Sequence, residues 1–326
     1  MKKILGMGNA LTDILLQIKN DSILSTLNLP KGSMQLINTE RSEEISNAVS
    51  QYDKIMATGG SASNTINGIT KLGLNAGFVG KIGKDDIGLF FTNDSVNNGV
   101  KPHLLLSKTP SGRCIVLVSP DSERTLCTYL GAACELEAGD LKPEMFQGYD
   151  IFHIEGYLVQ NHDLIRTAVK LAKEAGLKVS IDLASYNVVE ENLDFLHEIV
   201  MEYVDIVFAN EEEARAFTGK EPKEALIHIS DHCDIAVVKV GKEGSYIKSA
   251  DEHVQVTPRL AKAIDTTGAG DLYAAGFLFG IANEYSLEIC GKIGSLVAGN
   301  VVEVLGAKMT NEVWSEIQAE IKRIVN

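Results

Sequence analysis

The chain has 326 residues, of which 45% are hydrophobic and 23% are charged, a composition typical of a globular protein with one large domain or a large and a small one. Its formal net charge of −14 excludes the extended basic surface that nucleic acids and anionic membranes require, so we expect neither as a partner. The five cysteines form no CxxC pair and have no histidine at metal-ligand spacing. They indicate a reduced, cytoplasmic protein, and no signal-peptide pattern or run of eighteen apolar residues argues against this location.

The first strand is predicted at residues 3–8, and polar residues follow where this strand should end. Because ligands bind at the carboxyl ends of strands in an open α/β sheet, Asp13 is a candidate ligand for substrate hydroxyl groups. An ordinary turn aspartate is the equal alternative. The motif Gly6-Met7-Gly8 resembles the start of a dinucleotide fingerprint, but Leu11 replaces the third glycine and no helix pattern follows. We therefore reject a dinucleotide site.

Short alternating segments predict a small antiparallel sheet. Residues 112–118 and 124–130 alternate on either side of a turn and indicate a hairpin. A segment before Thr39 alternates in the same way. We expect a β lid formed by about 14–39 and 100–133, inserted into a single α/β domain that spans 1–326.

A glycine-led turn, Gly59-Gly60-Ser61-Ala62-Ser63-Asn64, precedes a helix predicted at 64–72. The two glycines permit close approach of the backbone to a ligand, and the Asn64 amide can both donate and accept hydrogen bonds. The alternative is a structural turn in which Ser61 or Ser63 caps the helix.

From residue 149 onward, strands and helices alternate regularly, which predicts a mostly parallel, doubly wound sheet with helices on both faces. His153 is expected to be a buried core residue of one strand. Asn210 and Glu213 follow the apolar strand predicted at 206–209. They lie either on the ligand side of the sheet or in an acidic first turn that favours helix formation.

The segment Asp265-Thr266-Thr267-Gly268-Ala269-Gly270-Asp271 leads into a helix that is apolar almost all round. N–H groups in a first helical turn lack intrahelical partners and, with the helix dipole, favour a bound anion such as phosphate. A carboxylate at Asp271 is costly beside a phosphate unless it takes a proton from an attacking hydroxyl group. The alternative is a helix start stabilised by the charge of Asp271.

The two glycine turns resemble the N-terminal and C-terminal signatures of the ribokinase family, the PfkB carbohydrate kinases, and the resemblance covers nearly the whole chain. It implies a ribokinase-like fold and ATP-dependent phosphorylation of a hydroxymethyl group. Asp271 would be the catalytic base. The N–H groups of Gly268, Ala269 and Gly270 would stabilise the transferring phosphoryl group.

The resemblance also implies the cofactor contacts. Asn210 and Glu213 match the family's NxxE pattern, which implies control of Mg²⁺ and phosphate through bound water. Asp265 and Thr267 match the region where some members bind a potassium ion. The residues expected at the nucleotide are Asn210, Glu213, Lys239, Gly241, Gly244, Thr266, Gly268 and Gly270.

The segments at 8–14, 124–133 and 155–158 resemble the adenosine-kinase-like bacterial branch, which implies a nucleoside acceptor. A nucleoside needs an apolar slot for its base and a polar cradle for its ribose; the apolar residues could instead merely pack the lid on the body. Fructose, ribose or a related sugar is the alternative acceptor, and a catalytically silent binding module is the second alternative. We expect a monomer, or a homodimer through a free lid edge. The residues expected at the acceptor are Asn9, Leu11, Asp13, Met34, Leu36, Gly59, Gly60, Asn64, Ile115 and Tyr157.

Overall fold

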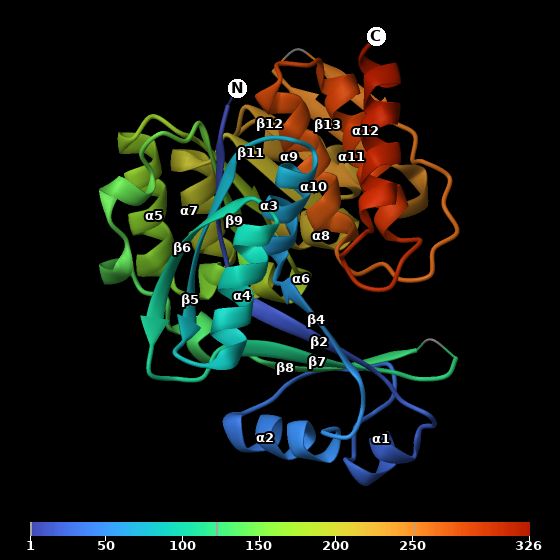
Figure 1. Ribbon diagram of the computed structural model, residues 1–326. Coiled ribbons are helices and arrows are strands. Elements are labelled where there is room, and N and C mark those ends of the chain that lie inside the picture. The colour runs from blue at the N-terminus through green and yellow to red at the C-terminus, as the bar shows by residue number, and fades with distance from the viewer. Residues whose placement is uncertain (1, 122, 251) are drawn as a thin grey trace.

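The computed structural model describes residues 2–121, 123–250 and 252–326. A nine-stranded sheet runs through the larger part of the molecule in the order β14-β13-β12-β11-β10-β9-β1-β5-β6 (Figure 1). It is parallel except where β13 pairs with its two neighbours, so the predicted doubly wound, mostly parallel α/β fold is confirmed. Its strands are β1 (Ile4–Met7), β5 (Ala76–Gly83), β6 (Val100–Ser107), β9 (Ile151–Glu155), β10 (Lys178–Asp182), β11 (Ile206–Asn210), β12 (Ile235–Lys239), β13 (Ser245–Ser249) and β14 (His253–Val256).

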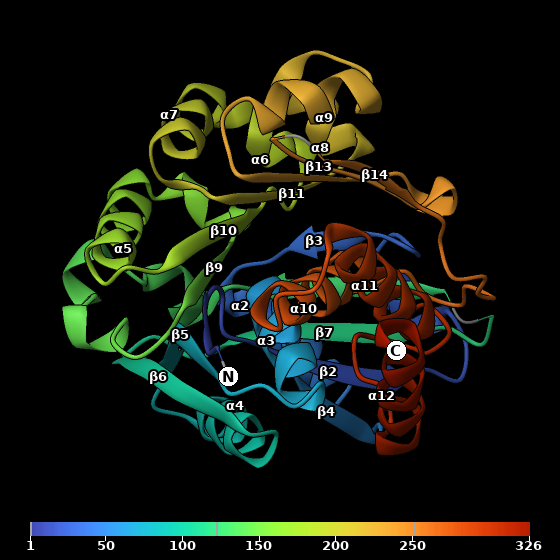
Figure 2. The same ribbon diagram turned by 90° about the horizontal axis from the view of Figure 1, so that it is seen from above.

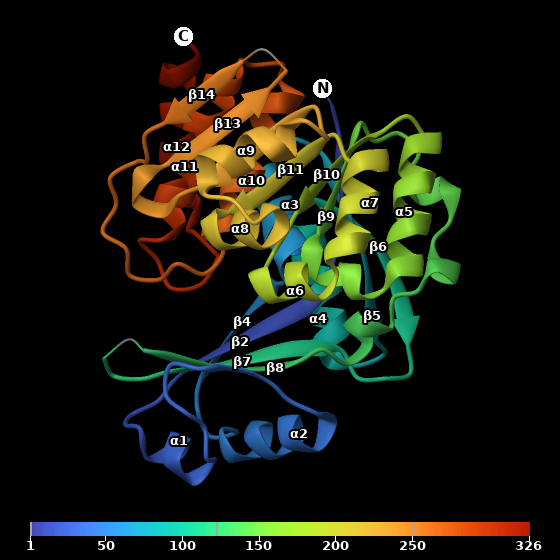
Figure 3. The ribbon, with the colours of Figure 1, turned by 180° about the vertical axis from the view of Figure 1, so that it is seen from behind.

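Helices cover both faces of this sheet, as Figures 2 and 3 show. Two separate clusters of buried apolar residues result, one on each face. One face carries α5 (His162–Glu174), α6 (Tyr186–Glu191), α7 (Leu193–Tyr203), α8 (Glu211–Thr218) and α9 (Pro222–Ser230). The other carries α3 (Ser61–Lys71), α4 (Asp86–Asn97), α10 (Ala269–Ala282), α11 (Leu287–Val301) and α12 (Asn311–Val325). Short 3-10 turns lie at Gly131–Glu135, Ala138–Asp140, Pro143–Met145, Gly156–Gln160 and Gly241–Glu243.

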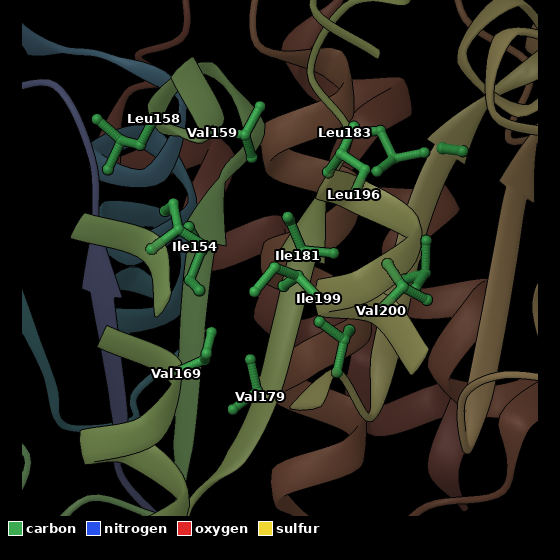
Figure 4. Packing of buried hydrophobic residues seen from close by; sticks show 14 of the residues in the cluster. Ile154, Leu158, Val159, Val169, Val179, Ile181, Leu183, Leu196, Ile199 and Val200 are labelled. Carbon is green, nitrogen blue, oxygen red and sulfur yellow. The ribbon is translucent and has the colours of Figure 1, made fainter. Parts of the chain in front are cut away.

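The central strands are apolar on both faces because helices bury both faces. In Figure 4, Ile154 of β9 and Ile181 of β10 lie beside side chains of α5 and α7. His153 is fully buried, its Nδ1 lies 3.1 Å from the Ser180 hydroxyl, and burial lowers its pKa to about 4. The prediction of a core histidine is therefore confirmed. No helix in the described part of the chain is long and apolar enough to cross a membrane.

The smaller sheet has five strands in the order β3-β8-β7-β2-β4 and lies beneath the large sheet in Figure 1. The predicted hairpin forms the antiparallel pair of β7 and β8, and β2 pairs antiparallel with β4. β2 and β7 pair parallel, as do β3 and β8, so the sheet predicted as antiparallel is mixed. The helices α1 (Ser22–Thr26) and α2 (Thr39–Ala48) cover its outer face. We call this sheet the lid. Its strands are β2 (Leu11–Gln17), β3 (Met34–Leu36), β4 (Lys54–Gly59), β7 (Gly112–Val118) and β8 (Arg124–Tyr129).

The predicted lid segments, 14–39 and 100–133, were wrong in two respects. β6 belongs to the large sheet, where it pairs parallel with β5 along its whole length after the α4 crossover. β4 belongs to the lid, although its burial does not alternate along the strand and so lacks the period expected of a half-buried strand. The lid is therefore formed by two stretches of chain, residues 11–59 with α1 and α2 and residues 112–129.

Candidate active site

A cavity of about 1460 Å³ lies between the inner face of the lid and the carboxyl ends of the large-sheet strands. Side chains at the ends of four strands that adjoin in the sheet line it, namely Glu155, Asp182, Asn210 and Lys239. This is the edge at which open α/β sheets bind ligands. The predicted site residues that line it are Asn9, Leu11, Asp13, Met34, Leu36, Gly60, Asn64, Tyr157, Asn210, Glu213, Lys239, Gly241, Gly244, Thr266, Thr267, Gly268, Ala269, Gly270 and Asp271.

The turn before α10 presents backbone donors to this cavity. Gly268 adopts φ +74°, and a Cβ atom there would lie 2.6 Å from the Ala307 Cβ, so the position requires glycine. The Ala269 N–H donates to the Thr266 carbonyl over 3.1 Å, so the predicted role of this N–H as a phosphate donor was wrong. Among the described residues, the N–H groups of Gly268 and Gly270 meet no acceptor. These two donors lie at the positive end of the helix dipole, where a bound anion is favoured, and we call this turn the candidate anion hole.

Asp271 lies in the first turn of α10, directly opposite the first turn of α3. Its carboxylate accepts a hydrogen bond from the Ser61 Oγ over 2.7 Å and another from the Asn64 Nδ2 over 3.0 Å. Burial raises the pKa of Asp271, while these two donors oppose the rise. The carboxylate is thus held in a fixed orientation beside the anion hole, which is the geometry required of a general base.

The α3 turn approaches its neighbours closely. Gly60 has φ +92°, and a Cβ atom there would lie 2.2 Å from the Asn9 carbonyl oxygen. Gly60 is also the N-cap of α3, and no side chain caps this end of the helix. The alternative of Ser61 or Ser63 as the cap was therefore wrong, and Ser61 bonds to Asp271 instead.

Asp13 lies on the inner face of the lid, at the bottom of the cavity. Its carboxylate rests on Gly59, where a Cβ atom would lie 2.5 Å from both carboxylate oxygens. Gly59 therefore supports Asp13 from behind and does not itself line the cavity. Burial raises the pKa of Asp13 to about 6, although the Lys308 and Arg124 cations lower it. Asp13 and Asn64 both line the cavity, where a carboxylate and an amide can bind hydroxyl groups.

Glu155 links the loop at Asn9 to the first turn of α3. It is 1% exposed and accepts hydrogen bonds from the Asn9 N–H over 2.8 Å, the Asn9 Nδ2 over 2.6 Å and the Ala62 N–H over 3.0 Å. Burial raises its pKa to about 7 against the effect of these donors. Glu155 was not among the predicted site residues, although its position at the carboxyl end of β9 indicates a residue of the ligand site.

On the nucleotide side, the NxxE residues are engaged with each other. The Asn210 side chain accepts from the Glu213 N–H over 2.8 Å, and the Glu213 carboxylate accepts from the Asn210 N–H and Nδ2, each over 2.7 Å. This capping box is the favourable acidic first turn, and because Asn210 and Glu213 also line the cavity, the two alternatives hold together. Burial and the nearby Asp182 raise the pKa of Glu213 to about 7.

Lys239 provides a cation at the anion hole. Its Nζ lies 2.8 Å from the Asp182 carboxylate and 3.1 Å from the position of a Cβ atom on Gly270. Asp182 ends β10 and was missed, although polar residues at strand ends are the usual signal for such a site. Lys239 is therefore fixed within reach of a group bound at the Gly270 N–H.

Arg124 of the lid contacts the loop before the anion hole. Its guanidinium lies 2.7 Å from the Asp265 carboxylate and contacts the Thr267 hydroxyl. Asp265 also accepts from the Thr267 N–H over 3.0 Å and the Gly306 N–H over 2.7 Å. A potassium ion at Asp265 and Thr267 would face the Arg124 guanidinium, which disfavours a second cation there. Potassium binding at these residues stays a prediction.

The inner face of the lid forms an apolar wall. Met34 and Leu36 lie on this face and are 60% and 67% exposed. Ile115 is 1% exposed and packs on the outer face, beneath α1 and α2, so its predicted acceptor contact was wrong. Successive side chains of a strand point to opposite faces, and it is therefore the neighbours Cys114 and Val116 that line the cavity.

A buried carboxylate lies beside a turn with backbone donors unpaired among the described residues, at the carboxyl edge of an α/β sheet, an arrangement suited to a phosphotransferase with an alcohol group as acceptor. A family model described as pfkB family carbohydrate kinase matches residues 32–314, and the chain belongs to this family. The chain is 35% identical to an adenosine kinase of Sinorhizobium meliloti of known structure, with a TM-score of 0.85 over 98% of this chain and 99% of that one.

Two further relatives differ in the acceptor that their names give. A probable sugar kinase from Rhizobium etli CFN 42 has the same TM-score of 0.85 and 33% identity over 98% of this chain and 99% of that one. A 5-dehydro-2-deoxygluconokinase of Bacillus subtilis is 28% identical over 75% of this chain and 80% of its own length. Family membership therefore establishes a kinase of sugars or nucleosides and leaves the acceptor to the chemistry of the cavity.

Proposed function

We propose that this protein transfers the γ-phosphoryl group of ATP to the hydroxymethyl group of a ribonucleoside such as adenosine. The observation that carries the proposal is the placement of Asp271. Its carboxylate is held by Ser61 and Asn64 on the acceptor side and stands one residue after Gly270 on the phosphate side. A hydroxyl group bound there would meet the base and the phosphoryl group together.

In the proposed reaction, Asp271 accepts the proton of the acceptor hydroxyl as its oxygen attacks the γ-phosphorus. General base catalysis of this kind contributes a factor of about 10² to 10⁴. The Gly268 and Gly270 N–H groups and the Lys239 ammonium stabilise the charge on the equatorial oxygens of the phosphoryl group. Preorganised donors of this kind are worth roughly 3 to 4 kcal/mol each in the transition state.

The nucleotide would occupy the part of the cavity between Gly244 and Thr266, which both line it. Bound Mg²⁺ would neutralise charge on the β- and γ-phosphates. The described residues contain no group of three side chains arranged to hold a metal ion directly. Because both Glu213 oxygens accept from Asn210, Glu213 would act on Mg²⁺ through bound water. This arrangement suits an ion that arrives with ATP and keeps part of its hydration.

The apolar wall favours a nucleoside over a sugar. A free sugar presents hydroxyl groups on all sides, and an apolar wall would leave part of them without hydrogen bonds. A flat base matches the wall formed by Leu11, Val116 and Leu126, while Asp13 and Asn64 hold the ribose hydroxyl groups. Similarity to an adenosine kinase along 98% of the chain supports the same acceptor.

A sugar kinase is the second candidate, favoured by relatives named for a gluconate-type acceptor. An acceptor with a carboxylate needs a cation to bind it. Of the four cations that line the cavity, Lys242 is exposed, and Arg124, Lys239 and Arg259 are already paired with Asp265, Asp182 and Glu303. A sugar acid is the weaker candidate, because the paired cations are not free to bind its carboxylate.

The experiment measures ADP release with a panel of nucleosides, fructose, ribose and gluconate-type acids. We expect the highest kcat/KM for a ribonucleoside. Preference for a sugar would replace the nucleoside with the second candidate, and tight acceptor binding without ADP release would indicate a catalytically silent module. The lid edges β3 and β4 end the five-stranded sheet, and a homodimer through either edge, or a monomer, would be distinguished by sedimentation of the same preparation.

A further inference from the structure

Lys308 lies beside β4 and is not among the residues that line the main cavity. Its side chain lines a second, separate cavity of about 520 Å³. Its Nζ donates to the Thr58 Oγ1 over 3.1 Å. Thr58 immediately precedes Gly59, the residue on which the Asp13 carboxylate rests. The ammonium group is therefore one buried threonine away from the turn that supports Asp13.

The segment that carries Lys308 is fixed to the anion-hole loop. The Gly306 N–H donates to the Asp265 carboxylate over 2.7 Å, and Ala307 packs against Gly268, where a Cβ atom would lie 2.6 Å from the Ala307 Cβ. At its other end the segment reaches β4 through Lys308. It thus spans from the phosphate side of the site to the acceptor side, and Lys308 has little freedom to move away.

Lys308 differs from the other two cations of the site. Arg124 and Lys239 each form an ion pair with a carboxylate, whereas Lys308 forms none within 4.0 Å among the described residues. Three carboxylates on three elements surround it at longer range: Asp13 on β2, Asp94 on α4 and Asp271 on α10. Removal of its ammonium from water lowers the pKa of Lys308 to about 8. Its charge is shared among these carboxylates.

We propose that Lys308 is a positioning residue of the acceptor site, whose ammonium charge keeps the Asp13 carboxyl ionised so that it can accept hydrogen bonds from the acceptor's hydroxyl groups. This inference rests on the proposed function, in which Asp13 binds the acceptor. Removal of a cation that faces a buried carboxyl group favours its protonation, so acceptor binding would be lost at a higher pH than in the wild type. Other charged and titratable groups face Asp13 and Lys308, namely Arg124 on β8, Cys114 on β7, Lys71 on α3, Asp94 on α4 and Asp271 on α10. Glu312 on α12 lines the second cavity together with Lys308.

The test compares Lys308→Gln with Lys308→Arg, using kcat/KM for the acceptor between pH 5 and 9. Glutamine can keep the hydrogen bond to Thr58 and lacks the charge. We expect the acidic limb of the kcat/KM profile to lie about one pH unit higher in Lys308→Gln than in the wild type. At pH values well below both midpoints this shift corresponds to a loss of about tenfold in kcat/KM. The loss should lie in KM, which should recover at high pH while kcat stays unchanged, and Lys308→Arg should keep the wild-type limb. Lys71→Gln, which removes a cation from the second cavity, is the matched control and should leave the limb in place.

An unchanged acidic limb in a folded Lys308→Gln protein would overturn the inference while leaving the proposed function intact. Absence of turnover in the wild type would instead remove the proposed function. A second measurement needs no activity: urea midpoints of Asp13→Asn, Lys308→Gln and the double variant. We expect their effects to be non-additive at pH 8 and additive at pH 5, where Asp13 is protonated. Additivity at both values would also overturn the inference.

Discussion

Replacement of Asp271 by asparagine removes the base and leaves the shape of the side chain unchanged. The carboxylate accepts from Ser61 and from the Asn64 Nδ2. The new amide group would face the Asn64 amide, whose Oδ1 is buried and has no partner among the described residues. This oxygen can accept from the new donor if the Asn64 amide flips. We therefore expect Asp271→Asn to fold with the site intact.

The expected loss is in the chemical step. A general base contributes a factor of about 10² to 10⁴, which corresponds to roughly 3 to 5 kcal/mol of barrier at 1.36 kcal/mol for each tenfold change. We expect kcat to fall by at least about 10² while nucleotide and acceptor binding stay within a few-fold. The free energy of unfolding should be unchanged or higher, because burial of the Asp271 carboxylate, which raises its pKa, destabilises the folded state.

The assay is ADP release at saturating substrates, with calorimetry for the two affinities. Asp150→Asn serves as the matched control, since Asp150 is an exposed carboxylate at the opposite, amino-terminal end of β9, where it accepts from the Lys3 N–H. This control should keep wild-type kcat. A kcat for Asp271→Asn within about tenfold of the wild type would refute the assignment of Asp271 as the base.

Three other variants or conditions address the rest of the site. Asp13→Ala should raise the acceptor KM by about tenfold or more with a smaller effect on kcat, and an unchanged KM in steady-state assays would remove Asp13 from the acceptor site. Gly268→Ala places a Cβ atom 2.6 Å from the Ala307 Cβ at φ +74°, so thermal melting should show a loss of about 1 to 3 kcal/mol and kcat should fall. The raised pKa of Glu155, about 7, gives a contribution to stability that is fully present below its unfolded pKa and is lost as pH rises through 7. Urea midpoints from pH 4 to 8 should therefore fall less steeply in Glu155→Gln than in the wild type, and parallel curves would contradict this.

Local patterns predicted the fold well because each depends on residues that are close in the sequence. The β7 and β8 hairpin and the helix after Gly268 follow from alternation and from glycine-led turns. The pattern failed for β4, whose burial does not alternate. For Ile115 the strand was correctly predicted and its face was not, because a single-residue error in phase reverses every side chain.

Much of the site also followed from the sequence, since polar residues at strand ends and helix starts converge on one edge of the sheet. The rule would have found Glu155 and Asp182 if it had been applied to every strand. The orientation of the Ala269 N–H depends on the backbone conformation of the turn from Thr266 to Ala269, which composition does not specify. Lys308 lies 250 residues from its partner Thr58, and no local pattern links two such positions.

The most direct test of the central claim compares adenosine with 5′-deoxyadenosine as the acceptor in the presence of ATP and Mg²⁺. The two molecules share the base and the ring, and they differ only in the hydroxyl group from which Asp271 would take the proton. We expect ADP and a nucleoside 5′-monophosphate to form in equal amounts with adenosine, and no ADP above background with 5′-deoxyadenosine. Equal ADP release with both, or phosphorylation of sugars alone, would contradict the claim.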